Sequence, residues 1–313
     1  MKIIVLGAGG FIGKNLVLKL LKQNYQVVAI DKYKINIDHP LLLKVTDAIN
    51  EDFALENYIE EGDCLIYLLA NSMPIHSNQD IYNDAKNNVM LAIKLFDKSI
   101  QAKIKKIIFA SSGGTVYGPY QHLPLDEKHP TNPNSAYGIA KLTTEKYLDL
   151  MCNNAKITGI SLRIANPFGP GQLPFRGQGV IATYLASFLC EKHIEIWGDG
   201  QAIRDYLYID DVVDAFIKAI EYHGASDVFN IGSNEGHNLT EIVDILSEIT
   251  HVYPHIEYKA TSGVEVNANI LDNTKAKTML SWYPRYNFKD GIRAMYDTWD
   301  EESTSFKIDT NIK

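Results

Sequence analysis

Short apolar runs alternate with stretches of helical spacing along the first half of the chain. The apolar runs have the length and composition of buried parallel strands and cover residues 2–6, 25–30, 64–70, 106–110 and 158–164. Between them, apolar positions recur at helical spacing over residues 11–23, 81–102 and 136–153. Because strands alternate with helices, this pattern predicts an α/β fold: a doubly wound parallel sheet covered by helices on both faces, with right-handed crossovers.

The regular alternation ends at Asn166. Glycine and proline cluster in residues 166–174, which is typical of a loop. Beyond it we expect helices near 179–192, 210–223 and 239–250, and short strands near 194–197, 206–209 and 255–259. We therefore interpret residues 1–166 as one domain and residues 167–313 as mainly a smaller α/β lobe, discontinuous, with some segments returning to the first domain. The last dozen residues are polar without a clear pattern, and we expect them to be frayed.

Composition narrows the class of protein. Of the 313 residues, 46% are hydrophobic and 22% are charged, which is ordinary for a globular protein. The net charge of −8 and the absence of a basic run argue against nucleic acid or an anionic membrane as the main partner. Three scattered cysteines form neither a metal-ligand pair nor a disulfide framework, which predicts no metal and a reducing compartment. With no long apolar stretch and no signal-peptide core, we expect a cytoplasmic protein.

The first candidate site is the glycine-rich segment GAGGFIG, residues 7–13, between the first predicted strand and helix. Gly7 permits a tight turn, Gly10 lets the backbone approach a pyrophosphate, and Gly13 allows close packing of helix on strand. The helix N-terminus offers free N–H groups to phosphates. Asp31 ends the next strand, where a carboxylate binds a ribose 2′-hydroxyl and disfavours a 2′-phosphate. This spacing predicts bound NAD rather than NADP.

A second candidate site is the pair Tyr137 and Lys141, four residues apart and so on one face of the predicted helix 136–153. The lysine ammonium would favour the phenolate and lower a pKa that starts near ~10. Such a phenol can take a proton from a hydroxyl or return one to a carbonyl. The Ser/Gly-rich residues 111–118 follow the strand 106–110, at the edge where open parallel sheets bind ligands, so their hydroxyls would face the nicotinamide end.

Taken together, these motifs resemble the extended short-chain dehydrogenase/reductase family, in its NAD-dependent nucleotide-sugar epimerase/dehydratase branch. The resemblance covers nearly the whole chain. Further matches are RIANPFGP at 163–170, GDG at 198–200, RDY at 204–206, DDV at 210–212 and NILD at 269–272. It implies a Rossmann-type NAD-binding domain with a smaller substrate-binding lobe. It also implies a homodimer joined through the helices near 84–101 and 137–152.

The resemblance assigns roles to individual residues. Tyr137 would be the acid/base, while Lys141 would bind the nicotinamide ribose. The full cofactor-binding set would be Gly7, Gly10, Phe11, Ile12, Gly13, Asp31, Lys32, Asp47 (toward the adenine), Leu69, Ala70, Asn88, Tyr137, Lys141 and Ile164. Asn166 and Arg204 would hold the nucleotide diphosphate, since a guanidinium binds phosphate oxygens bidentately. Judged from the residues alone, a surface ion pair between Arg204 and Asp205 is the alternative.

The chain departs from the family pattern in the loop after strand 106–110. The usual catalytic serine or threonine aligns with Gly113, which has no hydroxyl. Ser112 or Thr115 would replace it, and we prefer Thr115. Related 4,6-dehydratases carry an Asp-Glu pair where this chain has Gly114 and Thr115, so neither an acid nor a base for eliminating water is present. Dehydration is therefore disfavoured.

Two further departures concern the substrate. Ser262 stands where a second diphosphate-binding arginine is often found. Asn269, counted among the substrate-binding residues with Thr115, Tyr137, Asn166 and Arg204, aligns with a bulky tyrosine that excludes N-acetylated sugars in some members. Its smaller side chain would admit a 2-acetamido group.

The expected activity is 4-epimerisation of a UDP-hexose or UDP-N-acetylhexosamine, through transient C4 oxidation and hydride return to the other face of a rotated 4-keto sugar. Two alternatives remain open. One is an NAD(P)H-dependent nucleotide-sugar 4-ketoreductase that uses the same residues. The other is a non-catalytic NAD-sensing regulator, which would need the glycine loop but would have no use for Tyr137, Lys141 and Arg204 together.

Overall fold

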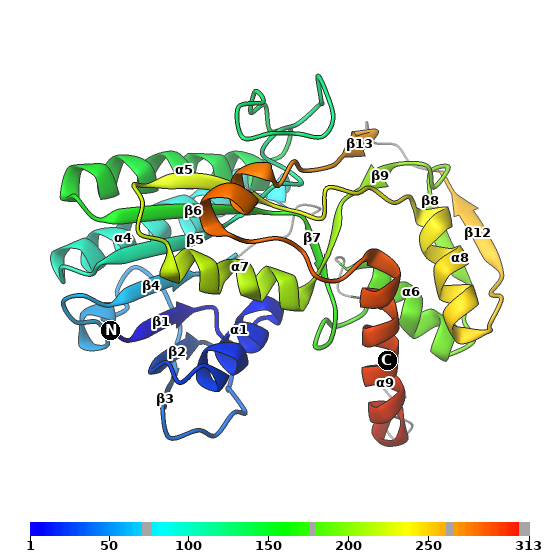
Figure 1. Ribbon diagram of the computed structural model, residues 1–313, viewed down its shortest axis with the longest axis horizontal. Coiled ribbons are helices and arrows are strands. Elements are labelled where there is room, and N and C mark those ends of the chain that lie inside the picture. The colour runs from blue at the N-terminus through cyan, green and yellow to red at the C-terminus, as the bar shows by residue number, and fades with distance from the viewer. Residues whose placement is uncertain (71–76, 176–178, 261–265, 307–313) are drawn as a thin grey trace.

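A seven-stranded, fully parallel sheet forms the centre of the computed structural model, which describes residues 1–70, 77–175, 179–260 and 266–306 (Figure 1). The strand order is β11-β6-β5-β4-β1-β2-β3. The strands are β1 (Ile3–Leu6), β2 (Val27–Asp31), β3 (Leu42–Thr46), β4 (Cys64–Tyr67), β5 (Lys106–Ser112), β6 (Thr158–Ile164) and β11 (Asp227–Ile231). This arrangement confirms the predicted doubly wound, Rossmann-type sheet.

Helices cover both faces of the sheet (Figure 1). One face packs against α4 (Leu91–Gln101) and α5 (Ala136–Ala155), and the other against α1 (Phe11–Lys22) and α7 (Ile209–Glu221). Successive strand residues point to opposite faces. Accordingly, Ile4 belongs to the apolar cluster with Leu95 of α4, and Ile3 to the cluster with Leu16 of α1.

The predicted helix over 81–102 is present with a distortion at its centre. It begins as α3 (Ile81–Ala85), passes through a π-helical turn, η2 (Lys86–Met90), and continues as α4. A single 3₁₀ turn, η1 (Leu55–Asn57), precedes β4. No helix within the described part of the chain is long and apolar enough to cross a membrane.

A smaller group of elements lies at one end of the sheet, on the right in Figure 1. It holds three two-stranded parallel ribbons: β7 (Asn166–Phe168) with β10 (Tyr206–Tyr208), β8 (Ile194–Trp197) with β12 (Ile256–Lys259), and β9 (Ile203–Arg204) with β13 (Ala268–Asn269). Its helices are α6 (Val180–Leu189), α8 (Leu239–Thr250) and α9 (Phe288–Phe306). A second π-helical turn, η3 (Ala276–Leu280), lies outside this group and packs against α7 and β11.

Two segments of the second half of the chain lie in the layers of the large sheet. Helix α7 packs against α1, and β11 pairs with β6 from Asp227↔Ile160 to Ile231↔Ile164. Strand β11 therefore forms one edge of the sheet, although it comes about 60 residues after β6.

The sequence patterns did not predict β3, β11 or α9. The expectation of a frayed end was wrong up to Phe306, because α9 extends that far, and residues 307–313 lie outside the described chain. Helix α9 is anchored by Phe288, Ile292 and Met295, which are buried at helical spacing.

Candidate functional site

The glycine-rich loop folds tightly between β1 and α1. The amide of Gly10 donates to the carbonyl of Gly7 at 3.2 Å, and Gly7 has a φ of 86°, in the left-handed region. A Cβ at Gly13 would lie 2.2 Å from the Gly7 oxygen, so only glycine allows this helix–strand contact. The carboxylate of Asp31 accepts the amide of Gly9 at 2.9 Å. The loop therefore has the tight turn and close packing that a dinucleotide site requires.

Other residues of the predicted cofactor set follow along the same edge of the sheet. Asp47 comes just after β3, and its amide donates to the Asp31 carbonyl at 3.1 Å. Leu69 and Ala70 follow β4, and Ile164 ends β6 with 5% of its surface exposed. The carboxyl ends of neighbouring parallel strands thus align these side chains in one row, while Lys32, Phe11 and Ile12 flank the glycine loop.

Helix α5 carries the predicted acid/base pair, Tyr137 and Lys141. Its first turn is capped by Ser135, whose Oγ accepts the Gly138 amide at 3.2 Å. The Lys141 ammonium lies 5.6 Å from the Tyr137 ring centre and donates to the carbonyl of Ala110 at 2.7 Å. That bond fixes Lys141 at the carboxyl end of β5, as a site residue in an open parallel sheet should be.

The pKa of Tyr137 differs from the sequence-based expectation. Burial, with a smaller contribution from the charge of Asp84, raises the pKa of Tyr137 to about 12, where lowering was predicted. Burial also lowers the pKa of Lys141 to about 8, and the charge of Glu145 partly opposes that fall. Spacing correctly indicates a shared helix face, but it does not indicate how far desolvation outweighs the attraction of one ammonium.

A small cavity brings four of the predicted cofactor residues together. Its lining residues are Leu69, Asn88, Phe109, Tyr137, Ala140, Lys141 and Thr144. Asn88 is held in this wall by Asp84, whose carbonyl and carboxylate accept its Nδ2 at 3.0 and 3.1 Å. The structure therefore joins residues from β5, η2, α5 and the segment after β4, which lie up to 72 positions apart between Leu69 and Lys141.

The loop after β5 explains the departure at Gly113. A Cβ there would lie 2.4 Å from Cδ1 of Leu271, so a hydroxyl residue at this position would require the buried Leu271 side chain to move. The Ser111 hydroxyl donates into the core, to Glu145. The buried Oγ1 of Thr115 has no hydrogen-bond partner among the described residues, which favours it over Ser112 as the replacement hydroxyl.

Two of the residues predicted to bind the substrate, Asn269 and Arg204, are register partners in β13 and β9. The Arg204 guanidinium donates to the carbonyls of Ile203 and Val266 at 2.9 and 2.8 Å. The alternative of an Arg204–Asp205 ion pair was wrong, because the Asp205 carboxylate is turned inward to Ser233.

Two amides complete this side of the site. Asn166 donates through Nδ2 to the Asp205 carbonyl at 2.8 Å. Asn269 donates to the Gly113 carbonyl at 3.0 Å, and its buried Oδ1 has no partner in the described chain. Ser262, expected in place of a second arginine, lies outside the described residues.

Sequence reasoning missed the buried ion pair beneath the site. Arg163 on β6 donates to Glu145 on α5 at 2.7 Å, and both side chains are almost fully buried. Glu145 lies four residues after Lys141 and eight after Tyr137, so all three share a helix face. The spacing of Glu145 from Tyr137 and Lys141 was the feature of the sequence that could have indicated its place beneath the site.

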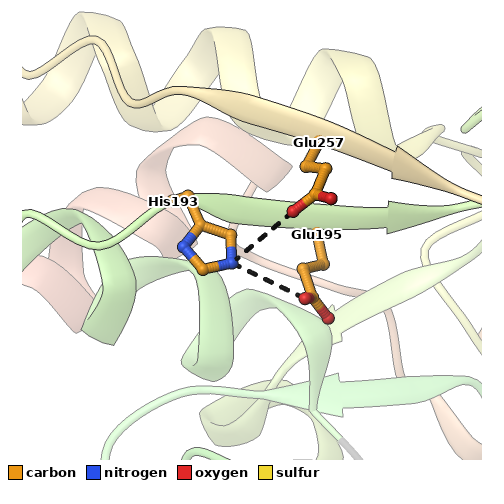
Figure 2. A group of neighbouring side chains, drawn as sticks. All are labelled: His193, Glu195 and Glu257. Atoms are coloured by element: carbon orange, nitrogen blue, oxygen red, sulfur yellow. Dashed lines mark ion pairs between the residues drawn. The ribbon is translucent and has the colours of Figure 1, made fainter.

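A separate polar cluster lies on the smaller lobe, at the paired strands β8 and β12 (Figure 2). His193 Nε2 is 3.5 Å from a carboxylate oxygen of Glu195 and 3.9 Å from one of Glu257. The Lys259 ammonium already binds both carboxylates, at 3.7 and 2.5 Å, and hydrogen bonding to it lowers the pKa of Glu257. One ammonium thus already pairs with both carboxylates of this exposed group.

Comparison with known proteins adds an independent line of evidence. Residues 3–232 match the model of the NAD dependent epimerase/dehydratase family. The chain is 32% identical to dTDP-4-dehydro-6-deoxyglucose reductase of Escherichia coli, over 93% of this chain and 95% of the relative. It is 30% identical to UDP-glucose 4-epimerase of Mycolicibacterium smegmatis, over 93% and 96%. The crystal structure of UDP-glucose 4-epimerase from Thermotoga maritima with UDP-glucose is similar at a TM-score of 0.91 and 34% identity, over 97% and 100%.

Proposed function

Because the chain belongs to the NAD-dependent epimerase/dehydratase family, we propose that it is an NAD-dependent 4-epimerase of a UDP-hexose or UDP-N-acetylhexosamine. The observation that carries this proposal is the convergence of Tyr137, Lys141 and Asn88 on one cavity at the carboxyl edge of the sheet. The proposal extends the names of similar proteins to this chain through the chemistry of its own residues.

The glycine loop fits a dinucleotide. A Cβ at Gly9 would meet Asp31, and one at Gly13 would meet the Gly7 carbonyl, so the backbone there stays bare for close approach of phosphates. The residues proposed to hold NAD are those of the loop with Asp31, Lys32, Asp47, Leu69, Ala70, Asn88, Tyr137, Lys141 and Ile164. When bound, NAD supplies the hydride acceptor for C4 and a positive charge that favours the phenolate of Tyr137.

The protein's own residues handle protons and orientation. The Tyr137 phenolate takes the proton of the sugar 4-hydroxyl and later returns it to the 4-keto oxygen. Lys141 supports the ionised form, and the partnerless hydroxyl of Thr115 is available to the same sugar oxygen. Arg204 and Asn166 hold the diphosphate, about which the keto sugar turns, and Asn269 lies on the sugar side.

We assign the two jobs to two parts of the chain. Residues 1–166 would hold NAD, and residues 167–313 would mainly hold the nucleotide sugar, with α7 and β11 returning to the large sheet. A cytoplasmic location belongs to the same proposal, because Cys64, Cys152 and Cys190 are all free thiols.

The test is to purify the protein without added NAD and incubate it separately with UDP-glucose, UDP-galactose, UDP-N-acetylglucosamine and UDP-N-acetylgalactosamine. Interconversion of one pair without net change in NADH absorbance is expected. In Tyr137→Phe, the rate should fall by about 10³-fold while the NAD content stays unchanged. Full activity in that variant, or no conversion of any of the four sugars by the wild type, would refute the assignment.

A second candidate is a nucleotide-sugar 4-ketoreductase, favoured by the 32% identity to the reductase of Escherichia coli. It would use Tyr137 and Lys141 to protonate a 4-keto oxygen during reduction. Stoichiometric loss of NADH or NADPH with a 4-keto nucleotide sugar would identify it, whereas an epimerase regenerates its cofactor in each turnover.

We propose a homodimer that buries the outer faces of α3 to α5. Large apolar side chains are exposed there, with Ile81 at 63%, Met90 at 58%, Ile139 at 53% and Leu150 at 55%. Between the helices lies an open groove lined partly by Ile81, Met90 and Ile139. An apolar face of this kind is typical of a protein interface. Ile139→Glu should convert the dimer to a monomer by light scattering, and a wild-type monomer would refute the proposal.

A further inference from the structure

Asp205 is a fully buried carboxylate at the centre of the substrate-side residues. It lies between β9 and β10 with 0% of its surface exposed. One carboxylate oxygen accepts the amide and the hydroxyl of Ser233, at 2.9 and 2.7 Å, and the other accepts the amide of Leu271 at 3.1 Å. The ion pairs of the described chain do not include Asp205. Burial raises the pKa of its carboxyl to about 6, and hydrogen bonds from Ser233 and Leu271 oppose that rise by stabilising the carboxylate.

The backbone of Asp205 joins two more segments. Its carbonyl accepts both the amide and Nδ2 of Asn166, at 3.0 and 2.8 Å. Its amide donates to the carbonyl of Asn269 at 2.9 Å. Asn269 in turn donates to Gly113, in the loop that carries Thr115. One residue therefore connects β7, β13 and, through Asn269, the hydroxyl loop after β5.

The carboxylate of Asp205 also holds the segment after β13 and the loop after β11 in place. Leu271, whose amide Asp205 holds, fills the space beside Gly113, where its Cδ1 would lie 2.4 Å from a Cβ. A Cβ at Gly232 would lie 2.4 Å from the Asp205 carboxylate, so the loop before Ser233 also packs directly on it. Arg204, the residue immediately before Asp205, is paired by its backbone with His237 just beyond that loop.

From these contacts we propose that Asp205 is a positioning residue, which sets Arg204, Asn166 and Asn269 in one arrangement for the nucleotide diphosphate and sugar. It does not touch the substrate, because it has no exposed surface. The inference rests on the proposed function, since it concerns how the residues assigned to the substrate are held.

The decisive variant is Asp205→Asn. It keeps the shape of the side chain but replaces one carboxylate oxygen with an NH₂ group. Either the donors of Ser233 or the amide of Leu271 then lose their acceptor. UDP alone is a suitable probe, because it carries the diphosphate without requiring turnover. We expect the Kd for UDP and the KM for the sugar nucleotide to rise about tenfold or more, with kcat changed less than about threefold and NAD content unchanged.

The chain offers a matched control in Asp211. This carboxylate is 1% exposed and also accepts two backbone amides, those of Arg285 and Tyr286, at 2.9 and 3.1 Å. Asp211→Asn makes the same chemical change in an equally buried place, on α7. It should lower the melting temperature by a similar amount and leave the Kd for UDP within about twofold of wild type.

The outcomes separate the inference from the proposed function. Unchanged UDP binding in Asp205→Asn, or equal weakening in Asp211→Asn, would overturn the positioning role while leaving the epimerase intact. A wild-type protein that neither binds UDP nor converts any sugar nucleotide would overturn both. If Asp205→Asn does not fold, Ser233→Ala keeps the carboxylate and the Ser233 amide bond but removes the 2.7 Å hydroxyl bond to Asp205, together with the contacts of that hydroxyl to Glu235, and it should raise the Kd about two- to fivefold. No rise in that variant would also count against the role.

Discussion

A buried lysine lies at each end of strand β5: Lys106 belongs to the strand, and Lys141 reaches its other end from α5. The two lysines differ in the hydrogen bonds that their ammonium groups make. At the amino end, Lys106 donates to the carbonyls of Ala219, Ile220 and Tyr222, at 2.6 to 2.7 Å, which closes the carboxyl end of α7. At the carboxyl end, Lys141 donates to one carbonyl, that of Ala110, and faces the cavity beside Tyr137.

Burial alone does not distinguish the two. Their exposed fractions are 3% and 7%, and burial lowers the pKa of each to about 8. The difference is that the three donors of Lys106 are matched by three acceptors, whereas Lys141 retains donors for a ligand within the described structure. We therefore interpret Lys106, whose hydrogen bonds are saturated, as a structural cation, and we propose that Lys141, whose hydrogen bonds are not, is the functional one.

The largest expected effect separates the two lysines directly. Lys141→Met should lower kcat by about 10³-fold and leave stability unchanged or improved, because it removes a buried charge. Lys106→Met should leave kcat within about threefold but lower the free energy of unfolding by about 2–4 kcal/mol, since three buried carbonyls lose their donor. Turnover assays and urea unfolding of both variants measure this. Similar profiles for the two variants would remove the distinction.

The pH dependence of stability is the next largest effect. Lys141 has a pKa of about 8 in the folded chain and 10.5 as its reference value. Between these values the unfolded chain binds more protons at this residue, so the free energy of unfolding rises with pH, by at most about 3 kcal/mol. In the NAD-free protein, the free energy of unfolding of the wild type should therefore rise over that range relative to that of Lys141→Met. Lys106 is present in both proteins, so its own titration cancels in the comparison. Parallel curves would contradict a buried ammonium at this end of β5.

The smallest effect concerns the hydroxyls at the carboxyl end. Thr115→Val should lower kcat about tenfold and raise stability by about 1 kcal/mol, because it removes a buried hydroxyl without a partner. Ser112→Ala is the control and should change kcat less than about twofold. Steady-state kinetics with thermal unfolding test both. A larger loss in Ser112→Ala would assign the replacement hydroxyl to Ser112 instead.

Sequence patterns predicted the elements that bury a continuous apolar run or stripe. Strand β6 has the predicted bounds, and α8 covers 239–250 as expected. Strand β3 was missed because three of its five residues are exposed, as is usual for an edge strand. Strand β11 begins with Asp227, and its pairing with β6 depends on a chain segment distant in sequence. Two-residue strands such as β13 have no local signal at all.

In the candidate site, too, features set by local geometry were predictable and features set by distant contacts were not. Spacing was sufficient for the tight turn at Gly7 and the shared helix face of Tyr137 and Lys141, because both follow from local geometry. The direction of the Tyr137 pKa shift was not predictable, since it depends on burial and on Asp84 from another helix. Likewise, the hydrogen bonds around Asp205 join segments that are distant in the sequence, so no local pattern predicts them. From the sequence alone, the adjacent Arg204 suggested an ion pair with Asp205 instead.

The three ribbons of the smaller lobe have a consequence for how the molecule folds. Each pairs parallel strands, so a crossover must be in place before its two strands can meet, and none can start from a local hairpin. Contacts of such long sequence separation form late. Since Arg204 meets Asn269 only when β13 joins β9, the lobe proposed to hold the nucleotide sugar assembles after most of the chain has been synthesised. We therefore expect the growing chain to bind its cofactor before it is able to recognise a substrate.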